Sequence, residues 1–136
     1  MLTATTMTQW VVRLTGLTQV VLGLLFWTGR ALTLLPFHML VGVTFVLALW
    51  VLAAIAAWTG LRPVLVLLAV SWGLVIPLFG MTHARLLPGS AHWIVQALHL
   101  LIGLGAMVIA ARLARYVRQH CRSSVQGQPT AVALPD

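Results

Sequence analysis

The sequence has almost no acidic residues. Its 136 residues include one carboxylate side chain, Asp136 at the last position, against eight arginines and no lysine. Charged residues make up 7% of the chain and hydrophobic residues 61%, whereas an ordinary soluble domain carries roughly a quarter charged residues. So few charges cannot cover a water-facing surface. The composition therefore predicts an integral membrane protein built as one compact domain.

The shortage of acids also narrows the possible chemistry. No pair of carboxylates is available for general acid–base catalysis, and no acid stands within an apolar run to relay protons or bind a hard cation. The sequence contains no phosphate-binding loop, metalloprotease motif or Ser-His-Asp set. We therefore expect no independent catalytic activity, and the site prediction includes no catalytic residue.

The net charge of +7 does not indicate a nucleic-acid partner. The arginines stand at the ends of apolar runs, where positive charge sets the orientation of membrane helices. Cysteine is also scarce, because Cys121 is the single example. One cysteine makes no intramolecular disulfide, CxxC site or CxxCH site. The first apolar run is followed by no convincing cleavage site, so we expect a retained helix rather than a signal peptide.

Four apolar runs are long enough to cross the roughly 30 Å of bilayer hydrocarbon, which takes about 20 residues. They cover residues 10–29, 37–59, 62–83 and 91–116. The runs are continuous and rich in Leu and Ala, which favours helices over strands. Short connections make neighbouring helices antiparallel. The expected fold is an all-α integral membrane domain over residues 1–122, with four transmembrane helices running up-down-up-down, followed by a disordered tail over 123–136.

The arginines predict the orientation of this bundle. Six fall on one side of the expected spans and two, Arg30 and Arg85, on the other. The six are Arg13, Arg62, Arg112, Arg115, Arg118 and Arg122. Cytoplasmic loops carry the excess of positive charge. We therefore expect a cell (inner or plasma) membrane protein with both termini in the cytoplasm, and the lipid bilayer as its first partner.

Four of the five histidines fall toward the predicted outer side. His38 opens the second run, His83 closes the third, His92 opens the fourth, and His99 lies two turns deeper. An ionisable residue inside a span is expensive, so a functional role is its default interpretation. Residues seven apart nearly superimpose on a helix, which places His92 and His99 on one face together with Gln96.

This placement suggests that a metal or haem ligand set is assembled from two helices. Neutral imidazole is an axial ligand of haem iron. The second and fourth runs are parallel in the expected topology, so His38 and His99 could reach opposite faces of one iron. His92 is the alternative mate for His99, since an error of one turn in either helix would exchange it with His38.

The surroundings of these histidines suit the same hypothesis. Gly42 and Gly103 each follow a candidate ligand by four residues and would leave room for the rim of a macrocycle. Arg30 and Arg85 are the two cations on that side and could pair with haem propionates. Together with Gln96, these residues complete the predicted cofactor site.

The stretches HMLVG (38–42) and HLLIG (99–103), with the glycine pair Gly16 and Gly23 in the first run, resemble small four-helix membrane b-type cytochromes. The resemblance is architectural and covers residues 10–116. It implies one haem b near the outer leaflet, because every spanning histidine lies on that side. A haem with two histidine ligands implies electron transfer, with a quinone or an outer-side redox protein as the partner.

Three other interpretations remain open. The four outer histidines could bind a metal ion, and Met39 and Met81 would favour copper. A histidine and Gln96 could instead hydrogen-bond the polar head of a quinone or lipid. The chain could also be a cofactor-free structural or assembly subunit of a membrane complex, or a homo-oligomer, in which the histidines only cap helices.

Overall fold

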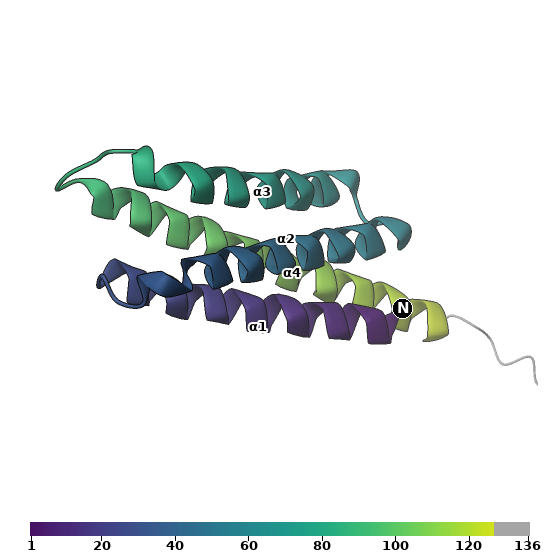
Figure 1. The fold of residues 1–136 in the computed structure, drawn as a ribbon. Helices are drawn as coiled ribbons and strands as arrows, with labels where there is room; N and C mark the ends of the chain where they lie inside the picture. Colours follow the sequence, from purple (N-terminus) through teal and green to yellow (C-terminus); the bar gives the residue numbers. More distant parts are fainter. Residues whose placement is uncertain (127–136) are drawn as a thin grey trace, which may run out of the picture.

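The computed structural model describes residues 1–126, which form helices joined by short connections, without a strand (Figure 1). The all-helical class expected from the sequence is thereby confirmed for these residues. The four long helices are each long and apolar enough to cross a membrane. In chain order the elements are α1 (Leu2–Trp27), the 3-10 turn η1 (Leu32–Leu34), α2 (Leu35–Trp58), α3 (Pro63–Thr82), the 3-10 turn η2 (His83–Arg85) and α4 (His92–Gln126).

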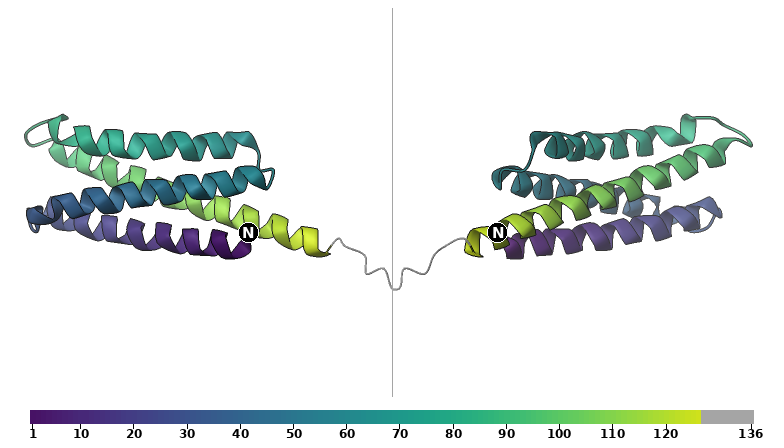
Figure 2. Two further views of the ribbon diagram at one scale, coloured as in Figure 1. Left: turned by 45° about the vertical axis from the view of Figure 1, so that its right-hand side comes forward. Right: turned by 180° about the vertical axis from the view of Figure 1, so that it is seen from behind.

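The connections lie at two opposite ends of the molecule. The α1–α2 and α3–α4 connections are at one end, which we call the histidine end (Figure 1). The N-terminus, the α2–α3 connection and the last turns of α4 are at the other, which we call the terminal end. Figure 2 shows α4 crossing the molecule, from beside α3 at the histidine end to beside α1 at the terminal end.

Two helices extend beyond the apolar runs from which they were expected. α1 begins at Leu2 rather than near residue 10. Its first turns are rich in threonine, whose hydroxyls donate back to carbonyls four residues earlier, as Thr6 does to Leu2 at 2.9 Å. α4 continues to Gln126, so residues 123–126 of the expected tail are helical. The remainder of that tail, residues 127–136, lies outside the described residues.

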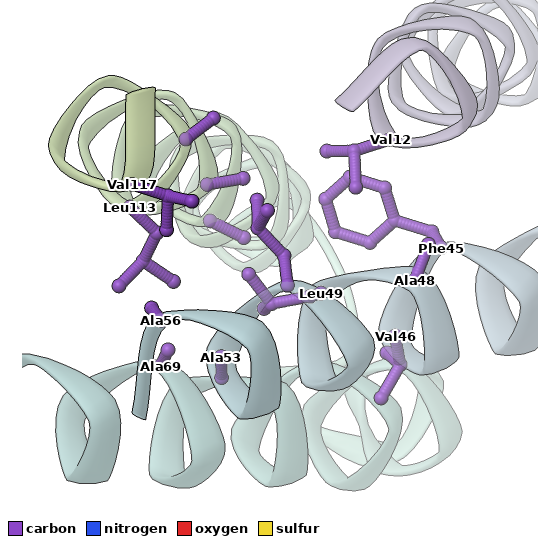
Figure 3. Close-up of a cluster of buried hydrophobic side chains, with 14 of the residues drawn as sticks. Val12, Phe45, Val46, Ala48, Leu49, Ala53, Ala56, Ala69, Leu113 and Val117 are labelled. Carbon is purple, nitrogen blue, oxygen red and sulfur yellow. The ribbon is translucent and has the colours of Figure 1, made fainter. Parts of the chain in front are cut away.

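The apolar core occupies the half of the molecule near the terminal end. Leu49 and Leu52 of α2 are fully buried against Leu113 and Val117 of α4. Val12 of α1 lies against the ring of Phe45 in this cluster, and Ala53, Ala56 and Ala69 line the contact between α2 and α3 (Figure 3). Small side chains let helix backbones approach closely, which is how helices pack in lipid.

Two tryptophans tie α3 to its neighbours. Trp50 of α2 donates its indole N–H to the carbonyl of Val70 at 3.3 Å. Trp72 of α3 donates to the carbonyl of Ile102 in α4 at 2.8 Å. Each bond satisfies an indole that would otherwise be unpaired in an apolar layer. α3 is therefore held on both sides by polar contacts as well as by packing.

Two amide side chains complete a ring of polar contacts around the four helices. Gln19 of α1 donates its side-chain N–H to the carbonyl of His38 in α2 at 2.8 Å. Arg118 of α4 donates to the buried Gln9 of α1 at 2.5 Å. Together with the tryptophan bonds, these contacts link α1 to α2, α2 to α3, α3 to α4, and α4 back to α1.

Glycines make room for three of these side chains. A Cβ on Gly42 would approach the Gln19 amide nitrogen to 2.6 Å, and one on Gly105 would approach the Trp72 ring to 2.9 Å. Gly73 takes the Trp50 indole in the same way. Real Cβ atoms essentially never come within 3.0 Å of a neighbouring atom, so a larger residue would displace each side chain.

Candidate functional site

The histidine end brings together four imidazoles from three elements. His38 lies in the first turn of α2 and His92 is the first residue of α4. His83 opens η2 directly after α3, and His99 lies two turns into α4. We call these four residues the histidine cluster. Short connections at this end bring them close together, although they are up to 61 positions apart in the sequence.

The rings of the cluster form a continuous series. The centroids of His38 and His99 are 6.5 Å apart, with their planes at 46°. His99 stacks on His83 at 5.4 Å and 16°, and His83 stacks on His92 at 6.1 Å and 25°. His38, rather than His92, is therefore the ring that the structure sets against His99 across the space between α2 and α4.

Two phenylalanines enclose the inner part of the cluster. Phe26 of α1 meets His38 edge to face at 5.2 Å, and Phe79 of α3 stacks on His99 at 5.9 Å. Gly80 lets the His99 ring lie against α3, because a Cβ at that position would come within 3.2 Å of the imidazole Cε1. All four long helices thus supply a ring or a contact to this site.

The hydrogen bonds divide the four histidines into two pairs. His83 Nδ1 lies 2.6 Å from the Gly80 carbonyl, and His92 Nδ1 lies 3.2 Å from the Leu86 carbonyl. A carbonyl can only accept, so Nδ1 of these two rings donates and Nε2 keeps a lone pair. This arrangement is the one that orients histidines bound to metals.

The inner pair lacks such partners. Nδ1 of His38 and Nδ1 of His99 are both buried without a hydrogen-bond partner, as is the side-chain oxygen of Gln19. Buried polar atoms are nearly always paired in folded proteins, so each exception calls for an explanation. Two unpaired imidazole nitrogens on neighbouring, tilted rings are free to bind an electron-pair acceptor or a hydrogen-bonding group.

The charge around the cluster is positive throughout. Arg30 and Arg85 are exposed in the two connections at the histidine end. The one acidic side chain of the sequence is Asp136, which lies outside the described residues. No carboxylate in the described part of the chain can therefore pair with either arginine or help to bind a cation.

The other predicted site residues lie in different surroundings. The space beside Gly42 is occupied by the Gln19 side chain. The space beside Gly103 is open, because nothing lies within 4 Å of a Cβ built there. Gln96 is half-buried on α4, one turn from each of its two histidines. Met39 and Met81 are 55% and 73% exposed, so neither is buried among the imidazoles as a thioether ligand.

Sequence reasoning missed three features of this site. Gly80, Phe26 and Phe79 contact the cluster, yet nothing in the sequence distinguishes them from other residues of their apolar runs. The sequence placed His83 at the end of the third apolar run, and the structure adds that its ring lies between those of His99 and His92. His83 follows Gly80 by three residues, but this spacing indicates a shared site only when the rotation of α3 about its axis is known.

The arrangement is not a preformed metal cage. Among residues 1–126, no group of three or more His, Cys, Asp or Glu side chains is placed to hold a metal ion. Within the described residues, the closest approach between histidines of α2 and α4 is that of His38 to His99.

Known proteins add no identification. No family model, no curated protein and no solved structure matches this chain. The class that the fold defines is an all-helical chain of four helices, each of membrane-spanning length and composition, with a histidine cluster at one end.

Proposed function

We propose that the chain is a multi-pass protein of the cell membrane, with four spans that run up-down-up-down and both termini in the cytoplasm. The distribution of arginine supports this orientation. Arg30 and Arg85 lie at the histidine end. The other six arginines lie toward the terminal end, in the first half of α1, in the α2–α3 connection and in the second half of α4. The positive-inside rule then assigns the histidine end to the outer side.

We further propose that the histidine end binds one haem b between His38 and His99. The observation that carries this proposal is the pair of neighbouring imidazoles, with centroids 6.5 Å apart and planes at 46°, whose Nδ1 atoms are buried and unpaired. A metal–imidazole bond is about 2 Å long, so two bonds plus the two ring radii span roughly 6 Å between centroids. The centroid separation of His38 and His99 is close to this span.

The surroundings of the pair fit the group in part. Phe26 and Phe79 supply apolar walls, and the open space beside Gly103 leaves room for part of a macrocycle. Gly42 does not supply rim space, because Gln19 occupies it. Arg30 and Arg85 are exposed at the same end and can pair with propionates, since guanidinium binds carboxylates in a bidentate manner.

In this proposal the chain holds and orients the group and controls access to it. If His38 and His99 held it, the haem would supply one-electron transfer rather than chemistry on a bound substrate. His83 and His92 lie between His99 and the end of the molecule, so they line the route by which a partner approaches. A site at one end of the spans serves a partner at that surface, which we propose is a quinone or an outer-side redox protein.

The experiment is a visible spectrum of the full-length protein, purified in detergent, before and after reduction. We expect a sharp Soret band and split α and β bands in the reduced state, as two imidazole ligands produce. A colourless preparation that also fails to take up added haem would contradict the proposal and leave a cofactor-free structural role.

Copper bound at the mouth of the site is a second candidate. The observation in its favour is that Nδ1 of His83 and Nδ1 of His92 are each bonded to a carbonyl, which leaves Nε2 of both rings able to coordinate. Metal analysis of the same preparation separates the candidates. Stoichiometric copper without a haem spectrum would favour the copper site, whereas haem without copper would exclude it.

A further inference from the structure

Two grooves flank α4, away from the histidine cluster. One lies between α1 and α4 and has a volume of about 470 Å³, with Val12, Leu104 and Met107 in its wall. The other lies between α3 and α4 and has a volume of about 350 Å³, with Leu68 and Trp72 in its wall. Val108 lines both grooves, so they run on either side of one ridge of α4.

Each groove contains one arginine. Arg13 lines the groove beside α1, and Arg112 lines the groove beside α3. Met107 packs on Gly16, and Arg118 bonds to Gln9, so α1 and α4 run antiparallel here. Arg13 lies between Gln9 and Gly16 in α1, so its level in α4 falls between Arg118 and Met107, close to Arg112. The two cations stand at nearly the same depth.

Both guanidinium groups are available to an anion. Arg13 and Arg112 are exposed, and the Arg13 guanidinium is positioned over the Trp10 ring, 5.4 Å from its centroid. The described part of the chain contains no carboxylate side chain that could neutralise them. A partner for these grooves must therefore bring its own negative charge, and its remainder must be apolar.

The grooves are long enough to hold part of an acyl chain. The α4 residues of the first groove run from Leu104 to Ala111, and those of the second from Gly105 to Leu113. At 1.5 Å per residue these stretches are on the order of 10 Å long. Basic pockets between membrane helices are known binding sites for anionic lipid headgroups.

We infer that each groove binds one anionic phospholipid, with the acyl chain against Val108 and the headgroup phosphate on Arg13 or Arg112. The lipids complete the surface of α4 where it crosses between α3 and α1. This inference is independent of the haem proposal, because the grooves share no residue with the histidine cluster.

The test is native mass spectrometry of the full-length protein, released from nanodiscs of equal phosphatidylglycerol and phosphatidylcholine with identical acyl chains. We expect wild-type protein to retain up to two phosphatidylglycerol molecules and little phosphatidylcholine. Arg13→Gln and Arg112→Gln should each lose one. Arg122→Gln is the matched control, because this exposed arginine of α4 lines neither groove, and it should retain two.

A second variant separates groove binding from simple attraction of headgroups to arginine. Val108→Trp puts a large ring on the ridge that the two grooves share while both arginines stay in place. The site is 53% exposed, so the fold should tolerate it. We expect it to lose at least one of the two lipids. Full retention in Val108→Trp or in the Arg13→Gln/Arg112→Gln double variant would overturn the inference. Equal retention of the two lipid types would also overturn it, as would displacement of the lipid by excess glycerol phosphate.

Discussion

At the scale of single residues, glycine determines where polar side chains can lie between these helices. Gln19, Trp50 and Trp72 each pack against a glycine of the next helix. Each donates a hydrogen bond to a backbone carbonyl that lies three or four residues before that glycine in the sequence. The absent Cβ lets the side chain reach the backbone. In an apolar layer this contact is a main source of directional attraction, because lipid gives no hydrophobic preference for one helix partner over another.

The Gln19–Gly42 contact gives a residue-scale prediction. Gly42→Ala should displace the Gln19 amide from the His38 carbonyl and destabilise the protein by about 1 kcal/mol. Denaturation in detergent measures the effect. In a Gln19→Ala background the same change should cost much less, since the displaced group is absent. Gly103→Ala is the control, because its Cβ meets nothing within 4 Å. Equal costs in both backgrounds would contradict the role given to Gly42.

Part of the residue-scale description was predictable from the sequence. The short connections place His38 near His83 and His92, so a cluster at one end could be expected. The rotation of each helix could not, because α2 and α3 are apolar on nearly every side and no stripe marks the inward face. The position of Gly80 under His99, and that of Gln19 in the space beside Gly42, depend on those rotations.

At the scale of elements, α3 is the least buried of the four long helices. Within its most apolar stretch 11% of the residues are buried, compared with 39% for the span that contains α2. α1 and α3 also lie on opposite sides of the α2–α4 contact (Figure 2). The bonds from Trp50 and Trp72 are therefore the main fixed points of α3 against its neighbours.

The Trp72 bond gives an element-scale prediction. Trp72→Phe keeps most of the ring but removes the donor, and hydrogen bonds between membrane helices average about 0.6 kcal/mol. We expect a loss of stability of roughly that size in thermal unfolding in detergent. Trp58→Phe is the matched control, because Trp58 is 82% exposed and should change stability by less. Equal shifts for the two variants would show that the indole bond adds nothing.

Helix ends were predicted less well than helix existence. All four helices were expected from the length of their apolar runs, but α1 begins earlier than its run. The reason is that Thr5 and Gln9 are polar by type yet buried in the structure. The Thr5 hydroxyl donates a hydrogen bond to the Met1 carbonyl at 3.1 Å, and the Gln9 side-chain oxygen accepts one from Arg118. A hydropathy pattern cannot register side chains whose polarity is satisfied inside the fold.

At the scale of the whole molecule, the arginine distribution predicts the orientation in the membrane. A green fluorescent reporter fused to the C-terminus should fluoresce, because that end should be cytoplasmic, and alkaline phosphatase at the same position should be inactive. The matched fusion in the α3–α4 connection, near Gly89, should give the opposite pattern. A C-terminal fusion active only as phosphatase would place the histidine end inside and contradict the orientation.

The whole molecule also separates stability from the proposed function. Its core cluster lies toward the terminal end, while the histidine end holds the four imidazoles, two of them with an unpaired buried nitrogen. Substitutions in the cluster should therefore affect a bound group more than they affect folding. This separation makes single histidine variants informative, since their loss of cofactor need not reflect a loss of the fold.

The most direct measurement is the haem content per polypeptide of four alanine variants, purified in parallel and checked by their elution as folded protein. If His38 and His99 hold the iron, His38→Ala and His99→Ala should lose the haem. His92→Ala should retain it, as should His120→Ala, which changes a histidine stacked on Tyr116 far along α4. Full haem retention in His38→Ala or in His99→Ala would contradict the ligand pair on which this account rests.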